Sequence, residues 1–338
     1  MEITRVDPSD AAAVAAWHAA WSAGASAGRV DPPVYLLSEV EVQLREDNPD
    51  RSYEIEAYAA IDGGVVVGGA TLEYPLRDNL RLAEIEVDVP VERRGRGVGG
   101  ALYEHLLKRV ESLGRGIVAT AIQQPIGGDE VPAVAFATKR GFTKRNTEIR
   151  RVLRLPVDTA RLDALAAEAA PHMDGYRVET WTGPCPEAYA EQYAHLKSLL
   201  MTDAPTGEMD YEQQVWDVAR LRADEDITAK QGRTVLTAVA VAPDGSLAGH
   251  TQIGLPGAGD GQRSFQWDTL VLRKHRGHRL GLALKVANLR ALMAEHPERD
   301  RNETWNASQN APMNAVNDKL GFQSIEEFQE WQRDAVAG

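Results

Sequence analysis

Residues 94–99 read Arg-Gly-Arg-Gly-Val-Gly, and residues 276–281, 182 positions later, read Arg-Gly-His-Arg-Leu-Gly. Two further landmarks accompany this glycine-rich loop in the same order. Asp62-Gly63 and Asp244-Gly245 precede the two loops at the same separation of 182, and Arg140-Gly141-Phe142 and Leu320-Gly321-Phe322 follow them 180 residues apart. Landmarks that recur in one order at nearly one spacing indicate an internal repeat. The sequence therefore predicts two copies of one domain.

Both copies share one pattern of predicted elements. Helical, Ala-rich or amphipathic segments come first, near residues 8–24 and 186–222. Two β-rich runs around an Asp-Gly turn predict a hairpin, at 53–61 with 65–74 and at 233–242 with 246–253. A third strand, 82–89 or 264–272, ends at the glycine-rich loop, and a helix with an apolar stripe at i, i+4 spacing follows. A further strand, a short helix and the Gly-Phe pair close each copy.

The order of elements also predicts the fold class. Hairpins beside a strand–loop–helix unit are typical of α+β domains, here with a mixed, mostly antiparallel twisted sheet flanked by helices. A length of 338 residues suits two domains of about 150 residues each. We expect the first domain at residues 1–155 and the second at 176–338, with an Ala- and Asp-rich helical linker at 156–175 between them.

Composition limits the classes of partner. No apolar run reaches the ~18 residues of a membrane helix, and the N-terminus lacks the features of a secretory signal, so we expect a cytoplasmic protein. The net charge of −13 argues against a nucleic-acid partner and favours encounter with a cationic substrate. Cys185 is the single cysteine, which excludes an internal disulfide. His275 and His278 lack the additional ligands that a metal site needs.

The glycine-rich loops predict an anion site. A strand that ends in such a turn and opens a helix presents unpaired backbone N–H groups at the positive end of the helix dipole, which suits a phosphate or pyrophosphate. A Rossmann loop would be the first strand–turn–helix of its domain, whereas several elements precede these loops. A P-loop ends in Gly-Lys-Ser/Thr, which neither copy contains. Glycines that serve only a tight turn remain an alternative for a single copy.

The pattern Arg-x-x-Gly-x-Gly after a strand, then a helix, then a Gly-Phe pair about 45 residues later, resembles the Gcn5-related N-acetyltransferase (GNAT) superfamily. The resemblance covers nearly the whole chain, once per copy, and the tandem arrangement is similar to that of mycothiol synthase. The first loop matches the superfamily's motif fully, whereas Arg279 replaces a glycine in the second. The resemblance implies that each loop holds the pyrophosphate of acetyl-CoA and that the preceding strand pairs with the pantetheine arm. A backbone N–H near Val89 or Val271 would then stabilise the oxyanion.

The cofactor-binding residues implied by this resemblance are, in the first copy, Val89, Val91, Arg94, Gly95, Arg96, Gly97, Val98 and Gly99. In the second copy they are Leu270, Val271, Leu272, Arg276, Gly277, His278, Arg279, Leu280, Gly281 and Asn310. The superfamily often places a tyrosine four residues before the Gly-Phe pair as a general acid. Ala137 and Asn317 occupy that position here, so the resemblance leaves the protonation of the thiolate in doubt.

Acidic residues on the third strand are the candidates for a general base. Glu86 and Asp268 occupy equivalent places, eight residues before Arg94 and Arg276. Glu84, Glu86 and Asp88 alternate as a solvated strand face would, whereas Asp268 lies in a more apolar strand, where burial would raise its pKa toward the range of a base. We therefore expect catalysis in the second copy, with Asp268 as base and Asn317 nearby.

The second copy also contains the richer set of candidate acceptor-binding residues: Asp203, Glu208, Asp210, Tyr211, Trp216 and Trp305. Acids with aromatic rings suit an ammonium group, although Asp203 and Asp210 would equally serve as helix caps. The expected function is transfer of an acetyl group from acetyl-CoA to a primary amine of a small, cationic acceptor. A non-catalytic acyl-CoA-binding sensor or scaffold is the alternative. The identity of the amine and the oligomeric state stay open.

Overall fold

The computed structural model describes residues 1–338 except 204, 258–261 and 336–338, and it leaves out the side chains of residues 201 and 202. The chain divides into two units: unit 1 contains Met1–Asn146 and Phe328–Gly338, and unit 2 contains Thr147–Glu327. This division differs from the expected boundaries in three ways. Residues 147–155, expected in the first domain, belong to unit 2. Residues 156–175 belong to unit 2 instead of forming a separate linker, and the end of the chain belongs to unit 1.

The sheet of unit 1 has the order β1-β2-β3-β4-β5, followed by the end of β12. The pairs β1–β2, β2–β3 and β3–β4 are antiparallel, and β5 runs parallel to β4. β6 and β12 each contribute residues to both units, because the unit boundaries fall inside them. The strands are β1 (Glu2–Arg5), β2 (Tyr53–Asp62), β3 (Val65–Pro75), β4 (Leu82–Asp88), β5 (Ile117–Pro125), β6 (Thr143–Arg154) and β12 (Gln323–Asp334).

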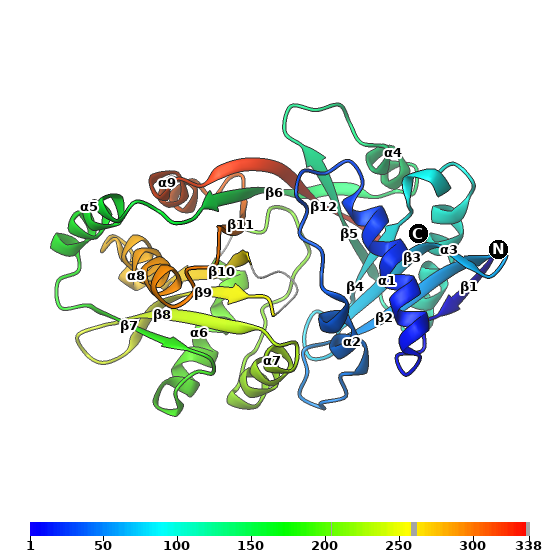
Figure 1. Cartoon of the computed structure of the whole chain (residues 1–338). Helices are drawn as coiled ribbons and strands as arrows, with labels where there is room; N and C mark the ends of the chain where they lie inside the picture. Colours follow the sequence, from blue (N-terminus) through cyan, green and yellow to red (C-terminus); the bar gives the residue numbers. More distant parts are fainter. Residues whose placement is uncertain (204, 258–261, 336–338) are drawn as a thin grey trace. The chain divides into compact units, whose positions relative to one another are not determined.

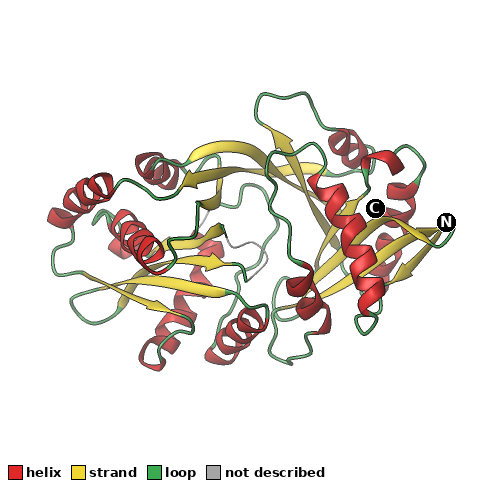
Figure 2. Cartoon of the chain, in the orientation of Figure 1, coloured by secondary structure: helices red, strands yellow, loops and turns green. Residues whose placement is uncertain are grey.

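Helices cover both faces of this sheet (Figures 1 and 2). Because side chains alternate along a strand, Tyr58 and Ala60 of β2 join the core under α3, whereas Ala57 and Ala59 pack against Trp17 of α1. The predicted stripe of α3 (Val98, Leu102, Leu106, Val110) is fully buried in the first of these cores. The helices are α1 (Ala11–Ser26), α2 (Leu37–Arg45), η1 (Val91–Arg93), α3 (Val98–Ser112) and α4 (Pro132–Thr138).

The sheet of unit 2 has the order β6-β11-β10-β9-β8-β7, in which β10 and β11 are parallel and the other pairs antiparallel. Its other strands are β7 (Arg177–Thr182), β8 (Thr234–Val241), β9 (Leu247–Leu255), β10 (Arg263–Val271) and β11 (Arg301–Ala307). Its helices are α5 (Thr159–Ala169), η2 (Ala170–His172), η3 (Glu187–Tyr189), α6 (Ala190–Asp203), α7 (Val218–Lys230), η4 (Arg273–His275), α8 (Leu280–Glu295) and α9 (Ala311–Leu320).

The cores of unit 2 follow the same alternation. Ala238 and Ala240 of β8 pack under α8, and Val239 and Val241 face α6 on the other side. The apolar side of α5 (Leu162 and Leu165) shares a core with α8 and α9. The expected linker segment is therefore helical, as predicted, and is an integral layer of unit 2.

The two units repeat one order of elements, and the predicted α+β fold is confirmed. Each has a hairpin, a third strand, a 3₁₀ turn, a long helix, a parallel strand and a short helix. The sequence patterns missed β1 and β7, helix α2, and the strands β6 and β12 after the Gly-Phe pairs. The helical region expected at 186–222 is divided into α6 and the start of α7. Among the described residues, no helix combines the length and apolarity needed to cross a bilayer.

Candidate active site

In each unit, the third strand separates from its parallel neighbour part-way along. β4 pairs with β5 only at Leu82, Ala83 and Glu84, although both strands continue for several residues. β10 likewise pairs with β11 only from Arg263 to Phe265. Beyond these pairs, backbone groups of β4 and β10 are released from the ladder and become available to a ligand. Glu86 and Asp268 both lie just beyond the point of separation.

The glycine-rich loops take the conformation that their glycines permit. In unit 1, Gly95 and Gly97 have φ values of 73° and 84°, and Gly97 caps α3. In unit 2, Gly277 has a φ of 90°, whereas the helix cap is Arg279, at a φ of 53°. A left-handed conformation is strained for a side chain other than glycine, at a cost of about 1–2 kcal/mol. The second loop therefore keeps the backbone path of the first at some expense in stability.

The first arginine of each loop makes the same contact in both units. Arg94 Nε donates to the carbonyl oxygen of Val89 at 2.8 Å, and Arg276 Nε donates to that of Val271 at 3.2 Å. These guanidinium groups brace the loop against the end of the preceding strand. The sequence interpretation assigned Arg94 and Arg276 to phosphate, whereas the structure gives each of them this partner within the protein.

Unit 1 offers other cations at its loop. The side chains of Arg93 and Arg96 make no hydrogen bond or ion pair within the described part of the chain, and Arg96 is exposed. Glycines at 95 and 97 leave open space, because a Cβ built on either one meets no atom within 4 Å. The first N–H groups of α3 lack intrahelical acceptors, as in any helix. The loop thus combines open backbone donors with unpaired positive charge, and it fits a pyrophosphate.

Carboxylates follow one face of the β3–β4 pair in unit 1. The register places Glu73 opposite Glu84, and Glu86 and Asp88 follow on the same face. Desolvation raises the pKa of all four groups; neighbouring carboxylates add to the effect at Glu73, Glu84 and Asp88, and the pKa of Asp88 rises to about 8. Arg29 opposes the shift at Glu86. The side chains of Glu84 and Glu86 are exposed, so solvent and an incoming amine can reach both.

Helix α1 approaches the end of β4 very closely. A Cβ at Gly24 would lie 2.6 Å from the nitrogen of Val89 and 2.7 Å from the carbonyl carbon of Asp88. The Val89 N–H follows the last paired residue of β4, and it has no backbone acceptor among the described residues. Gly24 therefore allows α1 to lie against the very N–H that the sequence interpretation named as an oxyanion donor.

In unit 2, a register shift between Gln266 and Thr269 interrupts the β9–β10 ladder around Asp268. Bulges of this kind re-aim side chains next to functional sites. The Asp268 carboxylate lies 3.9 Å from the ammonium group of Lys197, which is 3.6 Å from Asp224. The same ammonium lies 4.4 Å from the centre of the Trp216 ring. The expected base, Asp268, and the expected acceptor-binding ring, Trp216, thus both contact a lysine of the protein itself.

The other candidate acceptor residues lie in several segments of unit 2. Asp203 pairs with two arginines near the loop, Arg273 at 2.8 Å and Arg276 at 3.2 Å. Glu208 and Asp210 are exposed and Tyr211 is half-buried, in a segment without regular structure. Trp305 packs against Phe265, with ring centres 6.1 Å apart. Asp203 is therefore held at the phosphate loop by its arginine partners, and Trp305 of β11 packs against β10.

The two asparagines of α9 are occupied by structural contacts. Asn310 caps the helix and accepts from the N–H of Met313 at 3.4 Å. Asn317 is fully buried, accepts from Lys285 Nζ at 2.8 Å and donates to Asn306 at 2.5 Å. Burial lowers the pKa of Lys285 to about 7. Asn317 hence positions a buried lysine, and a direct catalytic role for it has no support in these contacts.

Residues 168–176 lie against the loop of unit 2. Arg279 forms an ion pair with Glu168, which also binds Lys319. His278 Nδ1 is 3.0 Å from the carbonyl oxygen of His172, and the Tyr176 hydroxyl is 2.8 Å from His275 Nδ1. No local sequence pattern indicates these partners, because the contacts join residues 99 to 151 positions apart.

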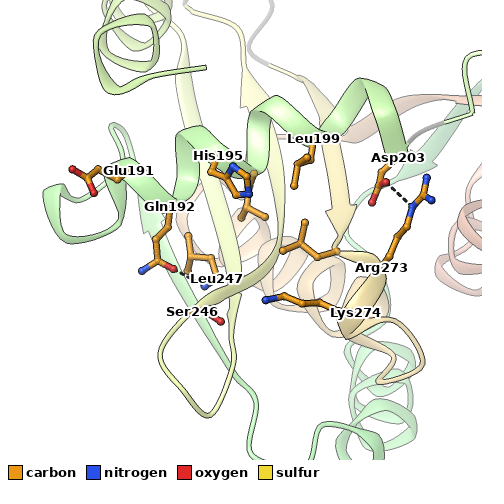
Figure 3. A pocket seen from close by; sticks show the side chains of 11 residues that line it. Glu191, Gln192, His195, Leu199, Asp203, Ser246, Leu247, Arg273 and Lys274 are labelled. Atoms are coloured by element: carbon orange, nitrogen blue, oxygen red, sulfur yellow. Dashed lines mark hydrogen bonds and ion pairs between the residues drawn. The ribbon is translucent and has the colours of Figure 1, made fainter. Parts of the chain in front are cut away.

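A cavity of about 640 Å³ opens on unit 2 between α6, the start of β9 and η4 (Figure 3). Leu196, Leu199 and Leu272 supply apolar lining, and Lys274 and the Asp203–Arg273 pair lie at its edge. This cavity borders the end of β10 and not the opening between β10 and β11. No group of three or more metal-ligating side chains occurs among the described residues.

Comparison with known proteins gives a consistent relationship. The model of the acetyltransferase (GNAT) family matches residues 25–142. A tandem GNAT protein from the clavulanic acid biosynthesis pathway, solved without acetyl-CoA, has a TM-score of 0.79 and 25% identity, and the match covers 100% of this chain and 99% of that chain. No curated protein sequence gives a significant match.

Two more distant structures share the fold. A GCN5-related N-acetyltransferase from Sphaerobacter thermophilus has a TM-score of 0.65 at 13% identity, with 100% of this chain and 96% of that chain covered. The GCN5-related glucosamine N-acetyltransferase region of a fungal multi-domain GH3 β-N-acetylglucosaminidase has a TM-score of 0.67 at 12% identity. That match covers 98% of this chain and 38% of the other chain.

Proposed function

Since the chain is a tandem member of the Gcn5-related N-acetyltransferase superfamily, we propose that it transfers an acetyl group from acetyl-CoA to a primary amine, and that unit 1 carries the reaction. One observation carries the choice of unit: in unit 1 an open phosphate loop, separated strands and unpaired carboxylates occur together. The sequence favoured the second copy because Asp268 looked less solvated than Glu86. The proximity of Lys197 to Asp268 removes that advantage.

The cofactor would be held by the loop and by the freed edge of β4. The N–H groups at the start of α3 and the side chains of Arg93 and Arg96 would bind the pyrophosphate. When bound, acetyl-CoA supplies a thioester carbonyl carbon that an amine attacks. The Val89 N–H, which follows the end of β4, would donate to the carbonyl oxygen as negative charge develops there.

Glu86 would act as the general base. An acceptor amine arrives as an ammonium and must lose a proton before it can attack, and Glu86 is an unpaired carboxylate at the opening. Its raised pKa brings it closer to the operating pH, which makes proton transfer more efficient. No acid stands at Ala137, but a thiol with a pKa near ~8.5 is a good leaving group, so thiolate departure depends less on a donor.

The carboxylates of β3 and β4 support a cationic acceptor. Like charges directly opposite one another in a sheet are destabilising, and the Glu73–Glu84 pair is such a case. Neither residue has an ion-pair partner within the described part of the chain. A bound amine with one or more positive charges would relieve this repulsion, and the net charge of −13 would increase its encounter rate.

The test compares Glu86→Gln with Asp268→Asn, which remove the same charge at equivalent positions. CoA release is followed with a thiol reagent over a panel of mono- and polyamines. We expect Glu86→Gln to lower kcat by about 100-fold or more, the usual scale for a lost general base, with CoA affinity unchanged. Asp268→Asn should stay within a few-fold of wild type. The reverse result places catalysis in unit 2, and CoA binding without turnover of any amine favours the binding-module alternative.

The pH profile supplies a second readout of the same assignment. A base with a raised pKa is protonated and inactive at low pH, so kcat/KM should rise with pH through the pKa of Glu86. Glu86→Gln should remove this limb from the residual activity, whereas a purely structural loss would scale the whole profile without changing its shape.

A further inference from the structure

The amine position of unit 2 is filled by the protein. Lys197 is buried, with 10% of its side chain exposed, and its ammonium group lies between Asp224 and Asp268 and over Trp216. Two carboxylates and an aromatic face are the groups that recognise a substrate ammonium. To admit an acceptor amine at Asp268, unit 2 would have to displace a buried charge from these three partners, which is costly.

The side chains of the phosphate loop of unit 2 are likewise paired with groups of the protein. Arg279, the cap of α8, pairs with the carboxylate of Glu168, and Asp203 holds the other loop arginine, Arg276. His278 contacts the carbonyl of His172. The three basic side chains of the loop, Arg276, His278 and Arg279, therefore already have acceptors within unit 2.

Unit 1 shows the opposite state at the equivalent positions. Arg96 corresponds to His278 and Gly97 to Arg279, 182 residues apart. Arg96 has no partner among the described residues, and Gly97 has open space around it. The two loops thus share a backbone path and differ in whether their side chains are already paired.

We propose that unit 2 is a self-occupied copy of the acetyltransferase fold: Lys197 holds the amine position, and the 168–176 segment with Asp203 holds the phosphate loop. This inference rests on the proposed function of unit 1 for its consequence, which is that each chain binds one CoA. Unit 2 transfers no acetyl group and contributes to the protein as a folded partner of the active unit.

Calorimetric titration with CoA tests whether the phosphate loop of unit 2 can bind the cofactor. Gly99→Glu and Gly281→Glu are a matched pair, because both glycines lie in the first turn of a helix and a Cβ at either meets its nearest atom at 3.7 or 3.9 Å. A carboxylate at either position repels a phosphate at that loop. We expect one CoA per wild-type chain, none for Gly99→Glu and one for Gly281→Glu, with thermal unfolding showing that both variants fold.

Two CoA per wild-type chain, or loss of binding in Gly281→Glu, overturns the inference. Absence of binding to the wild type has a different meaning: it contradicts the proposed function of unit 1 and agrees with a closed unit 2. The two proposals can therefore fail separately.

Removal of the internal ammonium tests the amine position. Lys197→Met removes the ammonium group near the two carboxylates, while Arg220 stays over the Trp216 ring at 4.5 Å, so added ethylammonium should raise the Tm of this variant more than that of the wild type. Lys230→Met is the control, because Lys230 pairs with Asp226 on the surface and is about half exposed. Equal shifts in Lys197→Met, Lys230→Met and wild type would show that Lys197 does not hold an amine site.

Discussion

Replacement of Gly24 by alanine should separate the geometry of β4 from cofactor binding. The new methyl group would lie 2.6 Å from the Val89 nitrogen and 2.7 Å from the carbonyl carbon of Asp88, distances that real contacts do not reach. Both atoms are backbone, so either α1 or the end of β4 must move by several tenths of an ångström or more. The Val89 N–H would then leave the position proposed for the oxyanion donor.

The expected magnitudes follow from this displacement. Overpacking of this kind costs about 1–3 kcal/mol, partly offset by the gain of up to ~1 kcal/mol from replacing a helical glycine. A misplacement near 1 Å lowers kcat by about 100-fold, and loss of an oxyanion donor costs a similar factor. The loop glycines are untouched, but Arg94 donates to the carbonyl oxygens of Val89 and Gly24 at 2.8 and 3.3 Å, so CoA affinity should fall by a smaller factor than kcat.

Two measurements decide this prediction: CoA release at saturating amine, and urea unfolding. Gly100→Ala is the control for stability, since the nearest atom to its Cβ is Arg140 Nη2 at 3.5 Å, and we expect it to be neutral or stabilising. A Gly24→Ala variant with wild-type kcat and wild-type stability would refute the argument, because it would mean that the α1–β4 contact relaxes without cost.

Two further predictions concern buried charges of unit 2. Arg150 donates to Glu303 at 2.9 Å and to Glu326 at 3.1 Å, and all three side chains are buried, so Arg150→Met should lower the free energy of unfolding by about 3–5 kcal/mol in urea titrations. The control is Arg151→Met, which should cost less than about 1 kcal/mol because its partner Asp318 is exposed; similar losses for both variants would contradict the burial argument. Burial lowers the pKa of Lys285 to about 7 from its ordinary value of 10.5, so the folded state binds fewer protons than the unfolded state between these pH values. The free energy of unfolding of the wild type should therefore rise from pH 7 toward pH 10 relative to that of Lys285→Met. A difference between the two that does not vary with pH would show that Lys285 is charged in the fold.

The repeated landmarks were sufficient to predict the fold, because they are local. An Asp-Gly turn, a glycine cap and an apolar helix stripe each encode one element, and their recurrence gave the order of elements twice. β6 and β12 were missed for a physical reason. Their sequences, such as Thr143 to Arg154, contain many charged residues, and Arg150 becomes a buried strand residue only because Glu303 and Glu326 neutralise it.

The candidate site was less predictable because its decisive contacts are tertiary. Asp268 and Trp216 were named from the sequence, but nothing near Lys197 in the chain indicates that its ammonium group lies between them. Glu168 was part of an expected linker, and its pairing with Arg279 joins residues 111 positions apart. One available signal went unused: Gly24 is a lone glycine in an Ala-rich helix, which often marks a close backbone approach.

The assignment of Phe328–Gly338 to unit 1 has a consequence for synthesis. A ribosome adds residues from the N-terminus at about 5–20 per second, and domains usually fold in the order in which they emerge. Here the N-terminal unit lacks the end of β12 until residues beyond Glu327 have been made, whereas every residue of unit 2 has been made by Glu327. The unit made first is thus the last to receive all its strands, and nascent chains stalled before residue 328 should hold the proposed active unit without the strand next to β5.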